Sequence, residues 1–401
     1  MLDFDSAQAR LSTAGKPPAA TETCPLHQAM GRVLAQTLVA TLDLPPADNS
    51  AMDGYAIRHA DYAAGKRLPV QQRCYAGEQP EALKPGHTIR LFTGSLVPQG
   101  ADTIVMQEDG SETDDQFEIL QAPVLGAHVR HQGEDVRKGG RLLAGGTRLG
   151  PAQIALLASQ GYASIPVFAP LKVGILTTGD ELVEPGQARA DEHIYNSNGP
   201  MLAALAEQMG ARPVHVLHAR DTQESLREAF AILLRDCDLI LTVGGVSVGE
   251  KDLVKPVIEE LGGALDLWRV RMKPGKPVAL ARIGDKPVVC LPGNPVSAFA
   301  VFTLLVTPLL RTMQGRNQAL PAVQYGTLAT DRIFNEKRDD FLRVQAAFGP
   351  QGQTTLTPYG QQGSNIISSL PWASGLARIP ADTPMGQGDT VAYYDLALWL
   401  A

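Results

Sequence analysis

The sequence predicts a multidomain α/β protein built around a three-layer α/β/α domain with a mostly parallel sheet. Three observations support this fold class. An apolar strand that ends in a glycine-rich or proline-rich turn occurs three times between residues 172 and 310, short β-rich segments fill residues 44–131, and strand and turn patterns return after Gly315. Strands that alternate with helices predict a parallel sheet covered on both faces, and the flanking β-rich segments predict separate β domains.

The composition indicates a protein with several real cores and limits its partners. The chain has 401 residues, 44% of them apolar, and a net charge of −7, which argues against a general binder of nucleic acids or anionic membranes. The acidic N-terminus lacks the features of a signal peptide, and the most apolar stretch, residues 296–310, is shorter than the ~18 residues of a membrane span. We therefore expect that stretch to be a buried helix. The cysteines form no CxxC pair, and two of them lie in predicted core strands. They indicate small reduced side chains in a cytoplasmic protein: Cys24, Cys74, Cys237 and Cys290.

The N-terminal part predicts a β domain inserted into a helical or mixed α/β domain. The first forty residues predict two helices, the second of which opens at Pro25 with apolar residues at helical spacing: Leu26, Met30, Val33 and Leu34. Residues 44–131 alternate short strands such as HTIRLF and ADTIVMQ with turn residues. A helix over residues 151–160 and the strand SIPVFAP follow, so the two parts of one domain flank the β domain.

The run DLILTVGGVSVGEKD, residues 238–252, predicts a buried strand that breaks into a glycine-rich turn and then a helix. Gly244, Gly245 and Gly249 would let the backbone approach a ligand closely. A helix that starts near Glu250 or Lys251 would direct its N–H groups at phosphate. The turn matches neither GxGxxG nor GxxxxGK[ST], and tight packing is an alternative reason for its glycines.

Two further strands end in turns of the same kind. Residues 173–176 lead into Thr177, Thr178 and Gly179, which are followed by a pair of adjacent carboxylates. Residues 288–291 lead into a stiff turn over residues 292–295 and then an apolar helix. Ligands of open α/β sheets bind at the carboxyl ends of the strands, so we expect the three turns to line one crevice.

The segment between the first two of these strands predicts a helix. Asn196 or Asn198 can cap its start, Pro200 suits its first turn, and Gly210 ends it. Its apolar stripe consists of residues at helical spacing: Met201, Leu202, Leu205 and Met209.

Residues 267–277, LWRVRMKPGKP, carry four cations without an intervening carboxylate: Arg269, Arg271, Lys273 and Lys276. If residues 267–273 form one strand, its period of two places the first three cations on one face. In a protein of net negative charge this pattern indicates a local anion site. A charged edge strand that prevents aggregation is the alternative.

Seven motifs, taken together, resemble those of one family. ADNSAMDGYA, LFTGS, RHQGEDVRKGG, TTGDEL, TVGGVSVGEKD, MKPGKP and LPGNPVSA occur in the order and approximate spacing of the MoeA family of molybdopterin molybdenumtransferases, which is also represented in the C-terminal part of gephyrin. The resemblance implies an elongated subunit of four parts: a split mixed α/β domain (residues 1–43 and 132–168), an inserted β domain (44–131), an α/β molybdopterin-binding domain (169–316) and a C-terminal β barrel (317–401). It also implies a homodimer, in which the inserted domain of one subunit faces the α/β domain of the other.

The activity implied by the resemblance is the last stage of molybdenum cofactor assembly. The substrates are molybdate and molybdopterin joined through its phosphate to AMP. The enzyme cleaves that linkage in a Mg²⁺-dependent step, releases AMP and places the metal on the dithiolene sulfurs. A molybdopterin adenylyltransferase and downstream molybdoenzyme chaperones are the expected partners, with no nucleic acid and no membrane involved.

The resemblance also assigns roles to individual residues. The carboxylates expected to bind Mg²⁺ or its waters are Asp180, Glu181 and Asp252, with Asp221 in second rank. The residues expected to cradle pterin or phosphate are Thr178, Gly179, Gly244, Gly245, Ser247, Pro292, Gly293, Asn294, Pro295 and Ser297. The groups expected to bind molybdate or offset charge are Lys273, Lys276, Arg269, Arg338 and Ser369, while Asp53 and Thr93 would come from the partner subunit. Two positions depart from the family pattern, because Arg269 replaces a frequent lysine and Gln361 replaces a frequent histidine.

Two other functions remain as alternatives. A molybdopterin adenylyltransferase shares the GGVS-type turn, but it needs only the α/β domain and would leave DNSAMDGY unexplained. A non-catalytic, gephyrin-like scaffold would use the same fold to anchor peptides. The chain begins almost directly with its first predicted helix and shows no long linker, which favours the enzyme over the scaffold.

Overall fold

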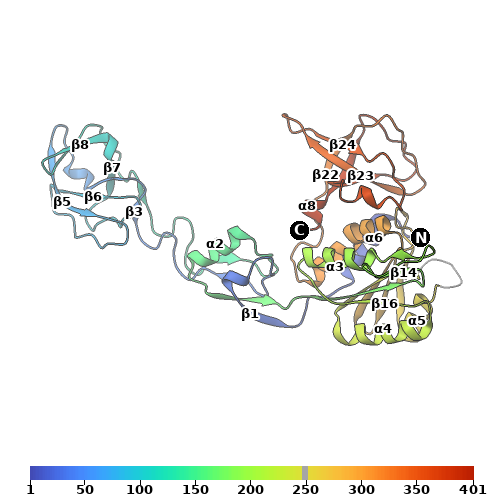
Figure 1. The fold of residues 1–401 in the computed structure, drawn as a ribbon. Helices are drawn as coiled ribbons and strands as arrows, with labels where there is room; N and C mark the ends of the chain where they lie inside the picture. The colour runs from blue at the N-terminus through green and yellow to red at the C-terminus, as the bar shows by residue number, and fades with distance from the viewer. Residues whose placement is uncertain (246–251) are drawn as a thin grey trace. The chain divides into compact units, whose positions relative to one another are not determined.

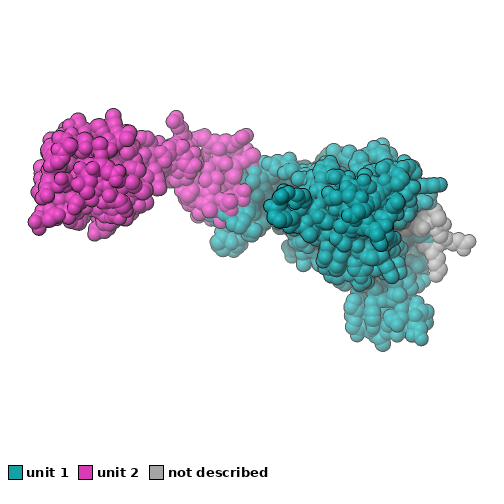
Figure 2. Space-filling view, turned by 90° about the horizontal axis from the view of Figure 1, so that it is seen from above, with its two compact units in different colours: residues 1–36, 145–151, 164–401 teal, residues 37–144, 152–163 magenta. Residues whose placement is uncertain are grey.

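The computed structural model describes residues 1–245 and 252–401 (Figure 1). Its residues cluster into two compact units, which Figure 2 distinguishes by colour. Unit 1 comprises Met1–Gln36, Gly145–Pro151 and Ser164–Ala401, and unit 2 comprises Thr37–Ala144 and Ala152–Ala163.

A six-stranded sheet forms the centre of unit 1. Its order is β16 (Arg212–Ala219), β13 (Lys172–Thr178), β17 (Leu239–Val243), β21 (Lys286–Leu291), β20 (Ala279–Ile283) and β18 (Ala264–Trp268). The first four strands are parallel, whereas β20 and β18 are antiparallel to their neighbours. Every residue of β17 is buried, as expected for a strand covered on both faces. The mostly parallel sheet is therefore confirmed, and the three predicted strands are adjacent in it.

Helices cover both faces of this sheet, which confirms the three layers (Figure 1). On one face, α4 (Gln223–Asp236) and α5 (Val254–Glu260) bury side chains such as Phe230 and Ile258. The other face carries α3 (Asn198–Gln208), α6 (Pro295–Val301) and α7 (Thr307–Met313), together with α1 (Phe4–Thr13), which contacts α7. The short strands β14 (Leu182–Val183) and β15 (Ile194–Tyr195) pair with each other before α3 begins.

The longest helix runs from Pro295 to Met313 through α6, the π-helical segment η4 (Phe302–Val306) and α7. Among the described residues it is the one helix that is long and apolar enough to cross a membrane, with 19 residues and a mean hydropathy of 1.7. The expectation that this stretch is too short for a span was wrong, because the helix extends past Leu310. The prediction of a buried core helix is confirmed, since 89% of its apolar window is buried inside the protein.

The C-terminal region of unit 1 is a closed five-stranded barrel. Its strands are β22 (Gln324–Leu328), β23 (Asp339–Phe348), β24 (Thr354–Pro358), β25 (Gly375–Ile379) and β26 (Thr390–Asp395), and the β23–β25 pairing closes it. The short strand β19 (Met272–Lys273) pairs with β23, and η5 (Ile367–Ser369) precedes β25. The chain ends in the helix α8 (Leu396–Trp399), where the sequence predicts strand and turn. The Asp395 carboxylate accepts hydrogen bonds from the first N–H groups of this helix.

The second N-terminal helix predicted from the sequence is wrong. Residues after α1 form β1 (Thr21–Pro25) and only one 3₁₀ turn, η1 (Leu26–Gln28). β1 pairs with β12 (Ser164–Phe168), and the Leu34 N–H then donates to the Thr147 carbonyl. Pairing with residues more than a hundred positions away satisfies this backbone, so it overrides the local helical spacing of apolar residues.

Unit 2 is mainly a half-barrel sheet. Its strand order is β7 (Thr103–Met106), β4 (Gly54–Ile57), β6 (Thr88–Leu91), β5 (Arg67–Cys74), β9 (Gln116–Ile119) and β8 (Gly110–Thr113). Three small elements of this region are η2 (His59–Asp61), η3 (Gln107–Asp109) and the pair formed by β3 (Asn49–Ser50) and β10 (Val129–Arg130). The pair β2 (Leu38–Val39) and β11 (Arg141–Leu143) and most of helix α2 (Pro151–Ser159) complete the unit. The predicted strands HTIRLF and ADTIVMQ and the helix over residues 151–160 are confirmed.

Candidate active site

The three predicted turns meet at one pocket in unit 1. The pocket has a volume of about 420 Å³ and lies at the carboxyl ends of β13, β17 and β21. Each strand end contributes described lining residues: Thr177 and Thr178 at the end of β13, Val243 at the end of β17 with Gly244 after it, and residues 292–295 after β21. Thr177 and Thr178 therefore belong to the strand and not to the turn that was predicted there. Ser297 of α6, the start of α3 with the residues before it, Glu181, Leu182 and Pro277 also line the pocket. The prediction of one shared crevice is confirmed.

The glycines in these turns serve two purposes. Gly244 has φ +94°, and a Cβ atom there would lie 2.6 Å from the Thr178 carbonyl oxygen. Gly245 has φ +63°, and its Cβ would lie 2.6 Å from a methyl group of Val254. Both residues therefore allow neighbouring segments to pack, which was the alternative reading. At Gly293 the nearest atom to a Cβ would be Gly244 Cα, 4.0 Å away, so this backbone is open towards the pocket.

Part of the predicted phosphate cradle lies outside the described residues. Ser247 and Gly249 lie there, as do Glu250 and Lys251, near which a helix start was expected. The next helix, α5, begins at Val254, after Asp252 and Leu253.

Two acidic residues meet beside the pocket. The Thr178 hydroxyl donates to Asp221 Oδ1 at 2.6 Å, and the Asp221 N–H donates to Asp180 Oδ1 at 3.2 Å. In return, the Asp180 N–H donates a hydrogen bond to Asp221 Oδ2 at 3.4 Å. Glu181 lines the pocket itself, and Gly179 leaves room for its carboxylate. Asp221, a second-rank candidate for Mg²⁺ binding, is thus in direct contact with Asp180 and Thr178.

The acidic residues supply oxygen ligands of the kind Mg²⁺ prefers. Within residues 1–245 and 252–401, no group of three or more His, Cys, Asp or Glu side chains is arranged to hold a metal. The three predicted metal ligands, Asp180, Glu181 and Asp252, are thus not assembled as a closed site. Mg²⁺ is typically held by one or two carboxylates together with substrate phosphates and water. The Asp180 and Asp221 pair fits that donor set.

Two asparagines at the start of α3 support the pocket, and Asn198 lines it. Ser197 occupies the N-cap position and not Asn196 or Asn198, but Asn196 Oδ1 accepts the N–H of Gly199 in the first turn at 3.1 Å. The Asn196 amide donates to Thr177 Oγ1 at 3.0 Å. The Asn198 amide donates to the Gly293 carbonyl at 2.7 Å and joins the wall to the turn after β21. The sequence reading treated Asn198 only as a cap, although the polar run NSN before a helix was visible.

The cationic segment does not form one continuous strand. β18 ends at Trp268, Arg269 adopts φ +66°, and only Met272–Lys273 resume strand geometry, now paired with β23 of the barrel. The Arg269 carbonyl and the Arg271 N–H both bond to Leu2, which explains why the chain leaves the first sheet here. The predicted alternation persists after the break, because Val270 and Met272 are fully buried while the cations between them are half-exposed.

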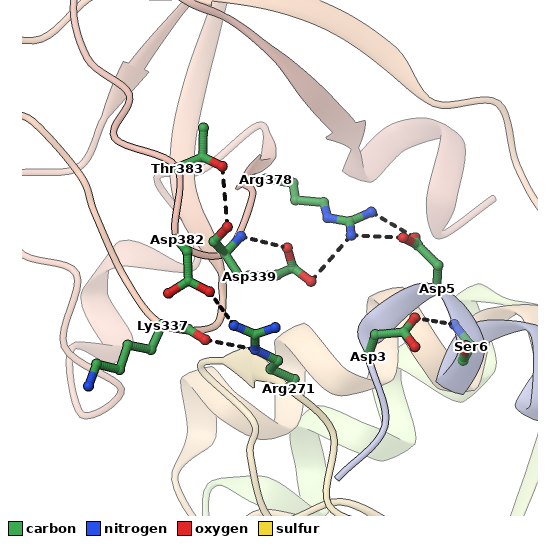
Figure 3. A network of polar contacts seen from close by, with 10 residues as sticks. Asp3, Asp5, Ser6, Arg271, Lys337, Asp339, Arg378, Asp382 and Thr383 are labelled. Atoms are coloured by element: carbon green, nitrogen blue, oxygen red, sulfur yellow. Dashed lines mark hydrogen bonds and ion pairs between the residues drawn. The ribbon is translucent and has the colours of Figure 1, made fainter.

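The barrel supplies carboxylates to this segment. Arg271 pairs with Asp382 and donates to the Lys337 carbonyl at 2.8 Å (Figure 3). The same view shows Arg378 between Asp5 of α1 and Asp339 of the barrel. Arg271 therefore ties its segment to the barrel.

Lys273 is held by two carboxylates of the barrel. Its Nζ lies 2.6 Å from Glu336 and 3.1 Å from Asp340, whose side chain is only 3% exposed. Burial acts to lower the pKa of Lys273, but the two carboxylates outweigh it and raise that pKa. Burial raises the pKa of Asp340. Lys276 is exposed and directly precedes Pro277, which lines the pocket.

The predicted C-terminal residues Arg338 and Ser369 lie in different environments. Arg338 donates to the Met272 carbonyl at 3.1 Å, beside Lys273. Ser369 is fully buried, and its hydroxyl accepts from Arg343 Nε at 3.1 Å and donates to the Ile366 carbonyl at 2.6 Å. The structure therefore places Ser369 inside the barrel and not at the pocket.

Arg343 is a buried residue that the sequence reading missed. Its guanidinium also donates to the carbonyls of Gln361, Gln362 and Gly363, and burial lowers its pKa to about 10, still far above neutral pH. The loop held in this way continues to Ser364, whose hydroxyl accepts from the Asn294 amide at 3.0 Å. Arg343 thus fixes the loop that contacts the turn over residues 292–295. Gln361, the departure from the family pattern, takes part here through its backbone.

Asp53 and Thr93 come together in unit 2. The Thr93 N–H and hydroxyl both donate to Asp53 Oδ1, at 2.8 and 2.9 Å, and these hydrogen bonds lower the pKa of Asp53. The two residues are separated by 40 positions, so the sheet brings the weak motifs DNSAMDGY and LFTGS to one place. All four cysteines are free and buried, including the two outside the predicted core strands.

The fold and the site define a class of protein: a three-layer α/β protein with a pocket at the ends of parallel strands, joined to a barrel that carries charged groups. Comparison with known proteins agrees with this class. Residues 2–161 match the MoeA N-terminal region (domain I and II), residues 174–312 match a probable molybdopterin binding domain, and residues 325–396 match the MoeA C-terminal region (domain IV).

Individual relatives are similar over nearly the whole chain. A molybdopterin molybdenumtransferase of Haemophilus influenzae is 35% identical over 92% of both chains, and molybdopterin molybdenumtransferase 2 of Mycobacterium tuberculosis is 36% identical over 93% of this chain and 95% of its own. The crystal structure of the molybdopterin biosynthesis MoeA protein from Pyrococcus horikoshii superposes with a TM-score of 0.83 at 30% identity, over 98% of this chain and 99% of that one.

The chain therefore belongs to the MoeA family of molybdopterin molybdenumtransferases. This family places it in molybdenum cofactor biosynthesis, as an enzyme that transfers molybdenum. The similarity covers the N-terminal and C-terminal regions as well as the α/β domain, so neither the adenylyltransferase nor the scaffold alternative is favoured.

Proposed function

We propose that this enzyme inserts molybdenum from molybdate into adenylated molybdopterin and releases AMP in a Mg²⁺-dependent step. The observation that carries the proposal is the convergence of three strand ends on one pocket, next to the turn that bears Lys276. The substrate joins a neutral heterocycle to a phosphoanhydride, so its site needs both a pocket and nearby cations.

The described residues suit the charges of this reaction. Lys276 is exposed beside Pro277. It would bind molybdate or the molybdopterin phosphate from which AMP is cleaved. Lys273 is shared between two carboxylates, so its charge is held in place but partly neutralised. Asp180 and Asp221 would hold Mg²⁺, which would offset the negative charge of the phosphoanhydride.

We further propose that the active form is a homodimer in which Asp53 and Thr93 of one subunit complete the site of the other. The geometry that supports their shared role is the double hydrogen bond that orients the Asp53 carboxylate. A complementation experiment tests this arrangement: Asp53→Asn and Lys276→Ala, each expected to be inactive alone, should recover activity when their subunits are mixed. Absence of recovery in verified mixed dimers would contradict the shared site.

The central test is release of AMP from adenylated molybdopterin by the purified protein. We expect release only when molybdate and Mg²⁺ are both present. Consumption of ATP with free molybdopterin would instead support an adenylyltransferase, and AMP release that is independent of molybdate would overturn the proposed insertion. The reaction is expected to take place in the cytoplasm, where the adenylyltransferase that makes the substrate and the chaperones that accept the product would be partners.

A further inference from the structure

Lys273, one of the cations expected to bind molybdate or offset charge, already contacts two carboxylates of the barrel. Its Nζ lies 2.6 Å from Glu336 Oε1 and 3.1 Å from Asp340 Oδ2. With both carboxylates ionised, one positive and two negative charges give this cluster a net charge of −1. Such a cluster repels a molybdate dianion, so one of the carboxylates has to move before Lys273 can bind it.

The fold holds the two carboxylates with different firmness. Asp340 lies on β23 opposite Lys273 of β19 in the strand register, and its side chain is 3% exposed. Moving it away from Lys273 would leave a buried charge without this partner, which is strongly unfavourable. Glu336 lies in the irregular segment before β23, and its side chain is 39% exposed, so water can solvate its carboxylate. Glu336 is therefore the carboxylate that can leave Lys273 at low cost.

The Glu336 carboxylate lies where two predicted oxyanion-binding cations act together. The hydrogen bond from Lys273 lowers the pKa of Glu336, and the positive charge of Arg338 lowers it further. Arg338 donates to the Met272 carbonyl at 3.1 Å, which holds it beside Lys273. A carboxylate stabilised by both cations takes the position that an oxyanion would need.

We propose that the Glu336 carboxylate occupies the oxyanion position on Lys273 before substrate binds, and that molybdate displaces it while Asp340 keeps the lysine in place. This idea rests on the proposed function, in which Lys273 takes part in binding molybdate. Molybdate carries two negative charges, so it attracts Lys273 and Arg338 more strongly than one carboxylate does. The apparent affinity for molybdate is nevertheless reduced, because only the fraction of molecules with Glu336 displaced can bind it.

Titration calorimetry of the purified protein with molybdate measures this competition. Glu336→Gln should bind molybdate about two- to fivefold more tightly than the unaltered protein, which is the strength of an ion pair between partly exposed groups. Glu336→Asp keeps the charge but is one methylene group shorter, so it should also bind molybdate more tightly. Glu228→Gln, at an exposed position of α4, is the matched control and should bind molybdate as the unaltered protein does.

Two results of this titration would overturn the proposal. Unchanged affinity in both Glu336 variants would show that the carboxylate does not compete with molybdate. A gain in Glu336→Gln alone would show that Glu336 acts through its overall charge and not through its contact with Lys273.

A double variant ties the effect to Lys273. In a Lys273→Met background, Glu336→Gln should leave the binding of molybdate unchanged, because the contact for which the two anions compete is gone. The same gain with and without Lys273 would contradict the displacement. If Lys273→Met does not fold, the comparison of Glu336→Gln with Glu336→Asp still decides.

The binding measurement does not depend on catalysis. Molybdate-dependent AMP release together with unchanged molybdate affinity in both Glu336 variants would refute the displacement and leave the proposed function standing. Tighter binding in both variants without any AMP release would support the displacement and contradict the proposed function.

Discussion

The pocket and the cationic segment of residues 269–276 adjoin at Pro277, but they are built in opposite ways. The described pocket wall has one carboxylate, no cation and an unsatisfied amide oxygen on Asn198. The cationic segment lies between two sheets, and the barrel holds Arg271 and Lys273 with carboxylates. The difference agrees with the proposed function, in which the pocket would bind the neutral heterocycle and the cationic segment would offset negative charge.

The largest expected effect comes from removing the exposed cation, Lys276. Lys276→Ala should lower AMP release by about 100- to 1000-fold, because one preorganised charge at the reacting group is lost. Binding of free heterocycle should not change. Lys337→Ala, an exposed lysine of the barrel, is the control. Equal weakening of heterocycle binding in Lys276→Ala would show that the two regions are not separate.

The second test concerns the carboxylates that hold Lys273. Lys273→Met should destabilise the protein by about 2–3 kcal/mol, because the buried Asp340 loses its cation, with the value reduced by the partial exposure of the lysine. Chemical denaturation measures this change. Adding Asp340→Asn should restore part of the stability, whereas Lys337→Met should change it by less than about 0.5 kcal/mol. A double variant no more stable than Lys273→Met would argue against the pairing.

Glycine substitution tests the packing of the pocket turns. Gly244→Ala combines φ +94° with a Cβ atom 2.6 Å from the Thr178 carbonyl, whereas Gly262→Ala has φ +77° and open space. Backbone strain alone costs about 1 kcal/mol, so Gly262→Ala should lose about that much stability and Gly244→Ala about 1 kcal/mol more. Thermal unfolding compares the two. Equal losses would mean that the contact with Thr178 is unimportant.

The smallest expected effect is a dependence of stability on pH. The hydrogen bond from Lys273 lowers the pKa of Glu336 below its ordinary 4.5. The stabilisation is therefore present above pH 4.5 and is lost as the pH falls through the lowered pKa. Glu336→Gln should remove this part of the acid sensitivity, which is below about 1 kcal/mol for a partly exposed pair. Identical acid unfolding profiles of the two proteins would exclude the contribution.

The sequence predicted those features that depend on local patterns. The apolar runs that became β13, β17 and β21 and the turns that follow them are local, so their meeting at one pocket followed from the rule for parallel strands. Asp53 and Thr93 were found through family motifs, although their contact depends on strand pairing in unit 2.

Long-range contacts explain what the sequence did not predict. The strand over residues 267–273 is broken because Leu2 bonds to the residues beside Val270, and the second N-terminal helix is replaced by pairing with β12. The Asn198 amide nitrogen donates to the carbonyl of Gly293, 95 residues away. None of these contacts leaves a periodic signal in the chain.

The central claim is that the heterocycle and the oxyanion occupy different regions. A crystal structure of the protein soaked with pterin and tungstate tests it most directly, since tungsten can be located by its anomalous scattering. We predict tungstate within hydrogen-bonding distance of Lys276 and the pterin ring in the pocket at the ends of β13, β17 and β21. Tungstate bound inside the pocket, between Gly293 and Asn198, would contradict the account.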